Sequence, residues 1–139
     1  MHELTPEPAV RVIALPVIRD DRGALSFAQV NDHLPFTPLR YFLLFDLAEN
    51  VSRGAHAHRE QEQFLVCVHG RCRVTLDTGR GQQAIDLPDA SCGIHVPPMV
   101  WTTVWPASAE TVVLVLTSAS YDAADYVREY DEFLRLVAR

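Results

Sequence analysis

The sequence predicts an all-β fold, an antiparallel sandwich or barrel of short strands followed by one C-terminal helix. Short runs rich in Val, Ile, Leu, Phe and Thr recur along the chain, and each has about the length of an ordinary strand. Turn-forming pairs such as His69-Gly70 and Pro97-Pro98 separate these runs. Many short strands at regular spacing are typical of antiparallel sandwiches and barrels. The expected strands cover residues 10–18, 40–46, 63–68, 72–77, 83–87, 93–96, 102–105 and 111–118.

One amphipathic helix is expected near the C-terminal end, over about residues 122–137. Asp122 is a suitable N-cap, and Asp125 places negative charge in the first turn, where the helix dipole favours it. We expect the apolar face of this helix to pack on the barrel or on a second subunit. Apolar side chains recur at helical spacing at Tyr126, Val127, Tyr130, Phe133, Leu134 and Val137.

Length and composition indicate a single globular domain over residues 1–139. Hydrophobic residues make up 48% of the chain, yet no apolar run approaches the roughly 20 residues needed to cross a bilayer. The first residues lack the basic and apolar regions of a signal peptide, so we expect a cytoplasmic protein without membrane contacts. The net charge of −6, with no basic stripe, argues against nucleic acid as a partner. A few arginines in a cleft can still bind a small anion.

Three cysteines, Cys67, Cys72 and Cys92, cannot all pair within one chain. None belongs to a Cys-x-x-Cys motif, so the sequence suggests neither a disulfide framework nor a thiolate zinc site. We interpret them as buried or partly buried thiols.

The most informative stretch runs from Arg53 to Gln63 and contains His56-Ala-His58. Residues two apart on a strand share a face, so the two imidazoles are expected to project together. The string resembles the first cupin motif, with Gln63 at the usual Glu position and Gly70 as the closing Gly. This resemblance implies a cupin jelly-roll β-barrel.

The second cupin motif resembles residues 88–102, and Thr102 stands where its histidine usually lies. A neutral amide and a hydroxyl thus replace two of the four expected ligands, and such groups hold a divalent transition metal poorly. We therefore expect no metal and no cofactor. His95 alternates with Ile94 and Val96, so it can face the interior as a replacement imidazole, a satisfied interior histidine or a substrate contact.

Two inward imidazoles can perform acid–base chemistry without a metal, because an imidazole titrates near pH 6.5. One can remove a proton beside a carbonyl while the other acts on oxygen. The alternative is that His56 and His58 are only hydrogen-bonded inside the barrel. Arg53 can bind a phosphate or stabilise an enediolate, or it can be a surface residue. Trp101 and Trp105 can stack on a base or sugar, or simply pack in the core.

A more specific resemblance extends over about residues 12–136. The chain resembles the sugar-nucleotide 3,4-ketoisomerases of deoxysugar biosynthesis. The stretches that carry it are Asp20-x-Arg22-Gly23-x-Leu25, Pro35-Phe36-x-x-x-Arg40, Arg53-Gly-x-His56-x-His58, Glu62-Gln63, Val66-Cys67-Val68-x-Gly70 and Val113-Leu114-Val115-Leu116-x-Ser118-x-x-Tyr121-Asp122-x-x-Asp125-Tyr126-x-Arg128-x-Tyr130-x-x-Phe133.

This resemblance implies a metal-independent isomerase that moves the ketone of dTDP-4-keto-6-deoxyglucose from C4 to C3. It implies a homodimer that exchanges N-terminal strands, here within about residues 10–30. It further implies that His56 shuttles the carbon proton and that His58 assists, moving protons on the sugar oxygens. Arg53 and Gln63 are expected to line the same pocket.

The chain also departs from the family. Phe42 and Leu43 lack the hydroxyls of the family's paired tyrosines, and Tyr41 is displaced by one position, which turns it to the other face of a strand. His95 stands where the family commonly has tyrosine. Tyr41, His95 and Trp101 complete our set of candidate substrate contacts.

Three other functions stay open at this point. A 3- or 5-epimerase of a keto-sugar nucleotide needs the same carbon-acid chemistry. A sugar-nucleotide-binding module that lost activity together with the tyrosines predicts binding without exchange at carbon. A metal-dependent cupin oxygenase or isomerase predicts stoichiometric metal.

Overall fold

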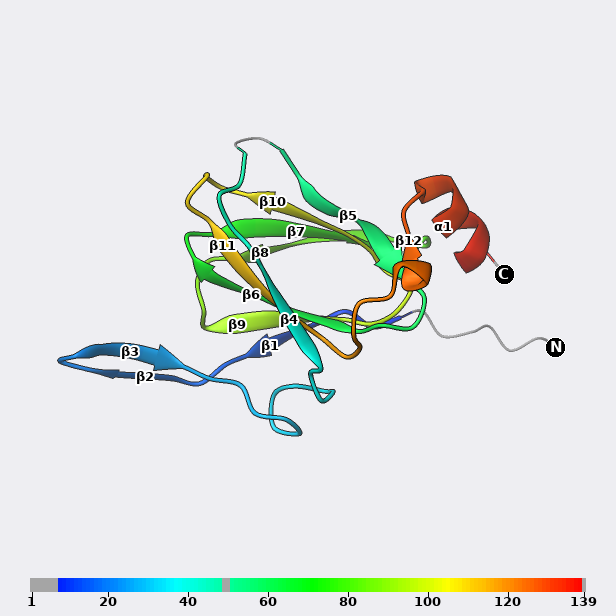
Figure 1. Cartoon of the computed structure of the whole chain (residues 1–139). Helices are drawn as coiled ribbons and strands as arrows, with labels where there is room; N and C mark the ends of the chain where they lie inside the picture. The colour runs from blue at the N-terminus through cyan, green and yellow to red at the C-terminus, as the bar shows by residue number, and fades with distance from the viewer. Residues whose placement is uncertain (1–7, 49–50, 139) are drawn as a thin grey trace.

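Two antiparallel five-stranded sheets face each other in the computed structural model, which describes residues 8–48 and 51–138 (Figure 1). The first sheet has the order β1 (Arg11–Ala14), β9 (Cys92–Val96), β6 (Gln63–His69), β11 (Val112–Thr117) and β4 (Arg40–Leu44). The second has the order β12 (Tyr126–Val127), β5 (Arg53–His58), β10 (Trp101–Pro106), β7 (Cys72–Asp77) and β8 (Gln82–Leu87). The expected jelly roll is confirmed, as two separate sheets rather than one closed barrel.

The expected N-terminal strand over residues 10–18 is divided in two. Pro16 lies between β1 and β2 (Val17–Asp20), where its missing N–H cannot contribute to a ladder. β2 pairs with β3 (Gly23–Ser26), and the backbone N–H of Arg22 donates to Oδ1 of Asp20 at 2.8 Å in the turn. This hairpin projects away from the two sheets (Figure 1).

The main core fills the space between the sheets. Alternate residues of each strand point inward, so one face of each sheet is apolar. Cys67 and Cys72 are among these buried residues, as expected from the sequence. The cluster consists of Leu65, Cys67, Cys72, Val74, Leu76, Leu87, Ile94, Val96, Val100, Val104, Val113 and Val115.

The C-terminal segment differs from the predicted helix over 122–137. A short 3-10 turn covers Ala123–Asp125, and Asp122 caps this turn rather than an α-helix. Strand β12 follows, because the backbone of Tyr126 and Val127 pairs with His58 and Ala57 of β5. The α-helix α1 spans only Tyr130–Val137. Edge pairing with β5 thus overrides the helical spacing of the first apolar residues.

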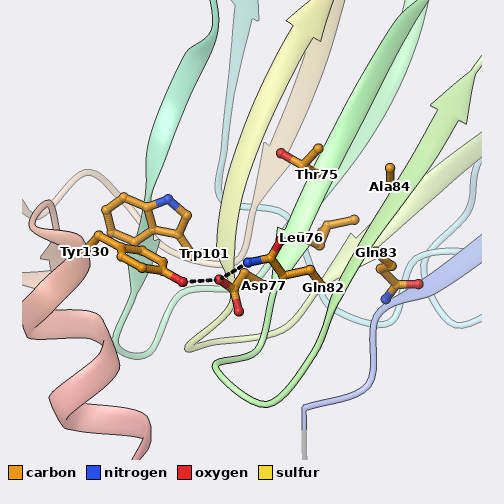
Figure 2. Close-up of a pocket in the computed structure, with 8 residues that line it drawn as sticks. All are labelled: Thr75, Leu76, Asp77, Gln82, Gln83, Ala84, Trp101 and Tyr130. Carbon is orange, nitrogen blue, oxygen red and sulfur yellow. Dashed lines mark hydrogen bonds between the residues drawn. The ribbon is translucent and has the colours of Figure 1, made fainter.

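Helix α1 packs on the outer face of the second sheet. Phe133 is fully buried in a cluster with Ala57 and Val127. The Tyr130 hydroxyl donates to a carboxylate oxygen of Asp77 at 2.5 Å, and Figure 2 shows this contact beside the Trp101 ring. No helix among the described residues is long and apolar enough to span a membrane.

Candidate active site

Strand β5 presents His56 and His58 on the face that looks toward the first sheet. Their ring centroids lie 4.9 Å apart with nearly perpendicular planes. Ala57, between them, points the other way and is fully buried against Val127 and Phe133. The shared face expected from the His-x-His spacing is therefore observed.

A cavity of about 370 Å³ opens beside His56 between the two sheets. This volume is in the range of small-molecule sites. Apolar side chains form most of its wall, and arginine, histidine, glutamine, threonine and tyrosine supply the polar groups. The lining residues are Arg40, Phe42, Leu43, Leu44, Arg53, Gly54, His56, Gln63, Leu65, Thr102, Val104, Val115, Tyr121 and Tyr126.

One layer of inward side chains is polar, whereas the layers beyond it are apolar. Thr117 of β11 pairs with Arg40 on one side and with Gln63 on the other. The Gln63 side-chain amide donates to Nε2 of His58 at 3.2 Å. We call Arg40, Thr117, Gln63 and His58 the polar layer. Two residues further along each strand, the inner face is apolar, at Phe42, Val115 and Leu65.

His58 is held in one orientation by partners on both ring nitrogens. Its Nδ1–H donates to a carboxylate oxygen of Asp125 at 3.0 Å. Because a carboxylate only accepts, the proton lies on Nδ1 and leaves Nε2 as an acceptor. Asp125 is itself fixed, since it accepts the backbone N–H of Glu60 at 2.8 Å and that of Gln61 at 3.3 Å. His58 is only 5% exposed, so this network is nearly sealed from water.

Both imidazoles are unprotonated at neutral pH. Burial, assisted by the charges of His58 and Arg128, lowers the pKa of His56 to about 4. Burial also lowers the pKa of His58, although the hydrogen bond and charge of Asp125 act in the opposite direction. Two neutral, neighbouring imidazoles can therefore accept protons without first losing one.

Three arginines make the surroundings of the histidines locally positive in an acidic chain. Arg40 and Arg53 line the cavity, and the Arg128 guanidinium lies 4.2 Å from the centre of the Tyr126 ring. None of the three forms an ion pair with a carboxylate in the described part of the chain. A cavity with unneutralised guanidinium groups is suited to an anionic ligand.

Arg53 and Gln63 lie in the cavity as the sequence suggested, but Tyr41 and Trp101 do not. Arg40 and Phe42 take the inner face of β4, so Tyr41 points outward and is 65% exposed. Trp101 points outward because Thr102 takes the inner face of β10, and its ring packs against Tyr130 and Phe133 (Figure 2). Neither residue lines this cavity in the described chain, so their expected contact with a substrate stays a prediction.

His95 also lies outside the cavity. Ile94 and Val96 occupy the inner face of β9 in the core, which turns His95 to the outer face of the first sheet. There its Nε2 lies 2.8 Å from a carboxylate oxygen of Glu62. Glu62, next to Gln63 in the sequence, faces away from the histidine pair. The pairing also explains why His95 can be buried on that face.

Several polar groups of the site were not predicted from the sequence. Asp125 was interpreted as a first-turn helix residue, and Tyr121 and Tyr126 were not identified as cavity residues. Arg40 was recognised only as part of a motif. The sequence does contain a hint of these residues. The stretch Tyr121-Asp122-x-x-Asp125-Tyr126-x-Arg128 has more polar and aromatic residues than a helix needs merely to pack on a sheet. Only the pairing of β12 with β5 brings it to the histidines.

Few groups around the histidines are available to bind a metal, since the Asp125 carboxylate already accepts from His58 and from two backbone N–H groups. His58 has the Gln63 amide and the Asp125 carboxylate as neighbours, and Thr102 pairs with His56 across β10 and β5. The Thr102 hydroxyl donates to its own strand, to the carbonyl of Val100 at 3.1 Å. Within residues 8–48 and 51–138, no three His, Cys, Asp or Glu side chains are grouped to hold a metal ion.

Comparison with known proteins yields matches over nearly the whole chain. The TDP-4-oxo-6-deoxy-alpha-D-glucose-3,4-oxoisomerase of Aneurinibacillus thermoaerophilus is 40% identical over 129 residues, which is 93% of each chain. A 3,4-ketoisomerase from Helicobacter canadensis has 32% identity and a TM-score of 0.89, covering 94% of this chain and 98% of that one. QdtA, a sugar 3,4-ketoisomerase from Thermoanaerobacterium thermosaccharolyticum solved in complex with TDP, has 29% identity and a TM-score of 0.88, covering 93% and 94%.

The family described as FdtA (WxcM-like, C-terminal) matches residues 8–138. This span contains both sheets, the histidine pair and the whole C-terminal segment that supplies Asp125. The sequence resemblance and the layered arrangement of the cavity thus agree with the family match, and the chain belongs to the FdtA (WxcM-like, C-terminal) family.

Proposed function

We propose that this chain is an isomerase that moves the keto group of a dTDP-4-keto-6-deoxyhexose from C4 to C3. The observation that carries the proposal is the pair of neutral imidazoles, of which His56 lines the cavity and His58, oriented by Asp125, lies directly behind it. The relative at 40% identity is a TDP-4-oxo-6-deoxyglucose 3,4-oxoisomerase by name, which supports the same reaction here.

The proposed substrate is a thymidine-diphosphate sugar. The unneutralised guanidinium groups of Arg53 and Arg128 are suited to its diphosphate. The solved complex of QdtA with TDP supports a nucleotide ligand of this kind. The cavity volume of about 370 Å³ suits a hexose inside, with the nucleotide extending toward solvent.

His58 is our candidate for the base that moves the carbon proton. The resemblance had implied His56, but His58 has the Asp125 carboxylate on Nδ1, which stabilises the imidazolium formed when Nε2 accepts a proton. His56 has a pKa of about 4, and within the described part of the chain no carboxylate forms an ion pair with it, so it suits transfer between oxygens. Gln63, which donates to Nε2 of His58, must yield that position to the substrate.

The reaction then balances without an external reductant. Nε2 of His58 removes the proton from C3, and the C3–H electron pair forms the C3–C4 double bond while the carbonyl electrons move onto the C4 oxygen. His56 carries the proton of the C3 hydroxyl to the C4 oxygen, and the C3 carbonyl forms as C4 takes the proton back from His58. The proposed reaction needs no metal, and turnover in the presence of a chelator tests this.

The first experiment is NMR of the protein with dTDP-4-keto-6-deoxyglucose in deuterated water, with chelator present. We expect a 3-keto product, and deuterium at C4 to the extent that the proton on His58 exchanges with solvent before it returns to carbon. A product that keeps its ketone at C4 but inverts a neighbouring carbon indicates an epimerase. Binding without carbon exchange indicates a binding module, and activity that requires added metal contradicts the metal-free mechanism.

We also propose that the protein is a homodimer that exchanges its N-terminal hairpin. β2 and β3 pair only with each other in the described structure, and Ile18 and Leu25 on this hairpin are 59% and 56% exposed. The outer face of the first sheet is also apolar, at Tyr41, Leu43 and Phe45. Apolar surface of this extent is costly to leave in water and suits a second copy.

Light scattering tests the dimer. Ile18→Glu places a charge on the hairpin, and we expect it to convert a dimer into a monomer, whereas Arg22→Glu on the same turn has a smaller effect. A wild-type protein that is monomeric at micromolar concentration contradicts the proposal. A cytoplasmic location stays a prediction from the sequence.

A further inference from the structure

Arg40 carries a positive charge that the described protein does not neutralise. Its side chain is half-buried, and Nη2 is fully covered without any hydrogen-bond partner. Among residues 8–48 and 51–138, its guanidinium makes a single hydrogen bond, a long one from Nε to the Thr117 hydroxyl at 3.4 Å. Such a group costs free energy to bury, so a purely structural role does not account for it.

The position of Arg40 is in the layer of the candidate base. Arg40 pairs with Thr117, Thr117 pairs with Gln63, and Gln63 contacts His58. The electrostatic effect of Arg40 reaches the base, because its charge contributes to lowering the pKa of His58. Phe42 and Tyr121 hold the guanidinium, with ring centres 5.3 Å and 5.5 Å from Cζ.

Arg53 occupies the other end of the same cavity. It begins β5, five residues before His58, and is paired with Val104 rather than with the polar layer. Leu44 and Arg53 together border a second hollow that opens to the surface. Leu44 is four positions from Arg40 on β4, which is roughly 13 Å along a strand. The two arginines therefore lie at different ends of the cavity.

The proposed isomerisation develops negative charge close to the base. Removal of the C3 proton places the charge on the C4 oxygen, and the return step places it on the C3 oxygen. A fixed cation a few ångströms away, in a site of low dielectric, stabilises both states more than the neutral ketone. A planar guanidinium suits two adjacent oxygens because it donates two parallel hydrogen bonds.

We propose that Arg40 is a catalytic residue that binds the two sugar oxygens and stabilises the enediolate, while Arg53 binds the diphosphate. The proposal rests on the isomerase function above. It assigns to β4 the charge stabilisation that the sequence had suggested for Arg53.

The test compares Arg40→Met, Arg40→Lys and Arg53→Met in turnover, in TDP binding by calorimetry and in thermal unfolding. Arg40→Met is expected to lower kcat at least 100-fold while the Kd for TDP changes less than threefold. Arg40→Lys keeps a point charge, so it should retain more turnover than Arg40→Met. Arg53→Met should have the opposite effects, because it should weaken TDP binding and lower kcat less than Arg40→Met does.

Thermal unfolding separates catalysis from structure. Because Arg40→Met removes an unneutralised buried charge, we expect its Tm to be unchanged or higher. Near-normal turnover in Arg40→Met, a parallel loss of TDP binding, or a folding defect in both Arg40 variants overturns the assignment. A wild-type protein that binds TDP but does not isomerise the sugar contradicts the proposed function instead, before any variant is compared.

Discussion

At each end of the C-terminal segment, residues 122–137, a carboxylate accepts a hydrogen bond from an aromatic side chain. The two contacts have different roles. Asp125 accepts the Nδ1–H of His58 at 3.0 Å on the cavity side of β5. Asp77 accepts the Tyr130 hydroxyl at 2.5 Å on the outer face of the second sheet (Figure 2). Similar hydrogen bonds thus join the same segment to opposite faces of one sheet.

The two contacts differ in whether the ring keeps a polar atom that is free to act on a ligand. Tyr130 uses its only polar atom on Asp77, and Asp77 is also occupied by the backbone N–H of Gly79 at 2.7 Å and the Gln82 amide at 3.2 Å. His58 has a second nitrogen that accepts hydrogen bonds within the polar layer. The contact between Asp77 and Tyr130 therefore only attaches α1 to the sheet. The contact between Asp125 and His58 orients a base.

Asp125→Asn is expected to have the largest effect. An amide can donate to Nδ1 and so favours the wrong tautomer of His58, and it no longer stabilises the imidazolium. We expect kcat to fall at least 100-fold with KM nearly unchanged. Steady-state kinetics with the keto-sugar nucleotide measures this split.

Asp122→Asn is the matched control, because Asp122 only caps the neighbouring 3-10 turn. The orienting role of Asp125 is wrong if both variants lose the same activity, or if Asp125→Asn loses activity only by unfolding. Circular dichroism spectra and thermal unfolding of both variants exclude the second case.

Gly79→Ala should have the largest effect on the packing of α1 near Asp77. Gly79 has a φ of +88°, and a Cβ there would overlap Cγ2 of Val137 on α1. We expect a loss of about 2 kcal/mol in the free energy of unfolding. Urea unfolding measures it, and Gly81→Ala, where a Cβ meets nothing within 4 Å, is the control. An equal loss in both variants would contradict the packing argument.

Acid should weaken the side of the C-terminal segment that contacts the histidines. An unfolded imidazole titrates near 6.5, whereas burial lowers the pKa of His56 to about 4. Between these values the unfolded state binds more protons, so stability is full above pH 6.5 and declines as the pH falls toward 4. We expect a decline of about 2 kcal/mol, reduced from the full shift because His56 is partly exposed to solvent.

His56→Gln removes this titration, and its free energy of unfolding should depend less on pH over the same window. Urea unfolding at pH 7 and pH 5 measures the difference. A variant with the same pH dependence as wild type would show that other groups cause the decline.

Tyr130→Phe is expected to have the smallest effect. It leaves a carboxylate that keeps its contacts to Gly79 and Gln82, so the loss should be about 1 kcal/mol. Turnover should stay within twofold of wild type, because Tyr130 faces away from the cavity. A tenfold fall in kcat would mean that the two ends of the segment are coupled.

The alternation of residues on strands could be predicted well from local sequence. The His-x-His spacing predicted the common face of His56 and His58. The same alternation also argued against Tyr41 in the cavity, and the structure agrees. The position of Trp101 could not be judged alone, because an aromatic residue suits both a core and a ligand site.

The sequence by itself determined the all-β class, the strand faces and the chemistry of two neutral imidazoles, because these depend on periodicity and on residue type. Only the tertiary structure decided which polar groups meet. Asp125 reaches His58 because residues 126–127 pair with the edge of β5 instead of continuing into α1. Arg40 faces Gln63 because both pair with Thr117 on β11. The contacts Asp125–His58 and Arg40–Thr117 join residues 67 and 77 positions apart, and local spacing carries no information about them.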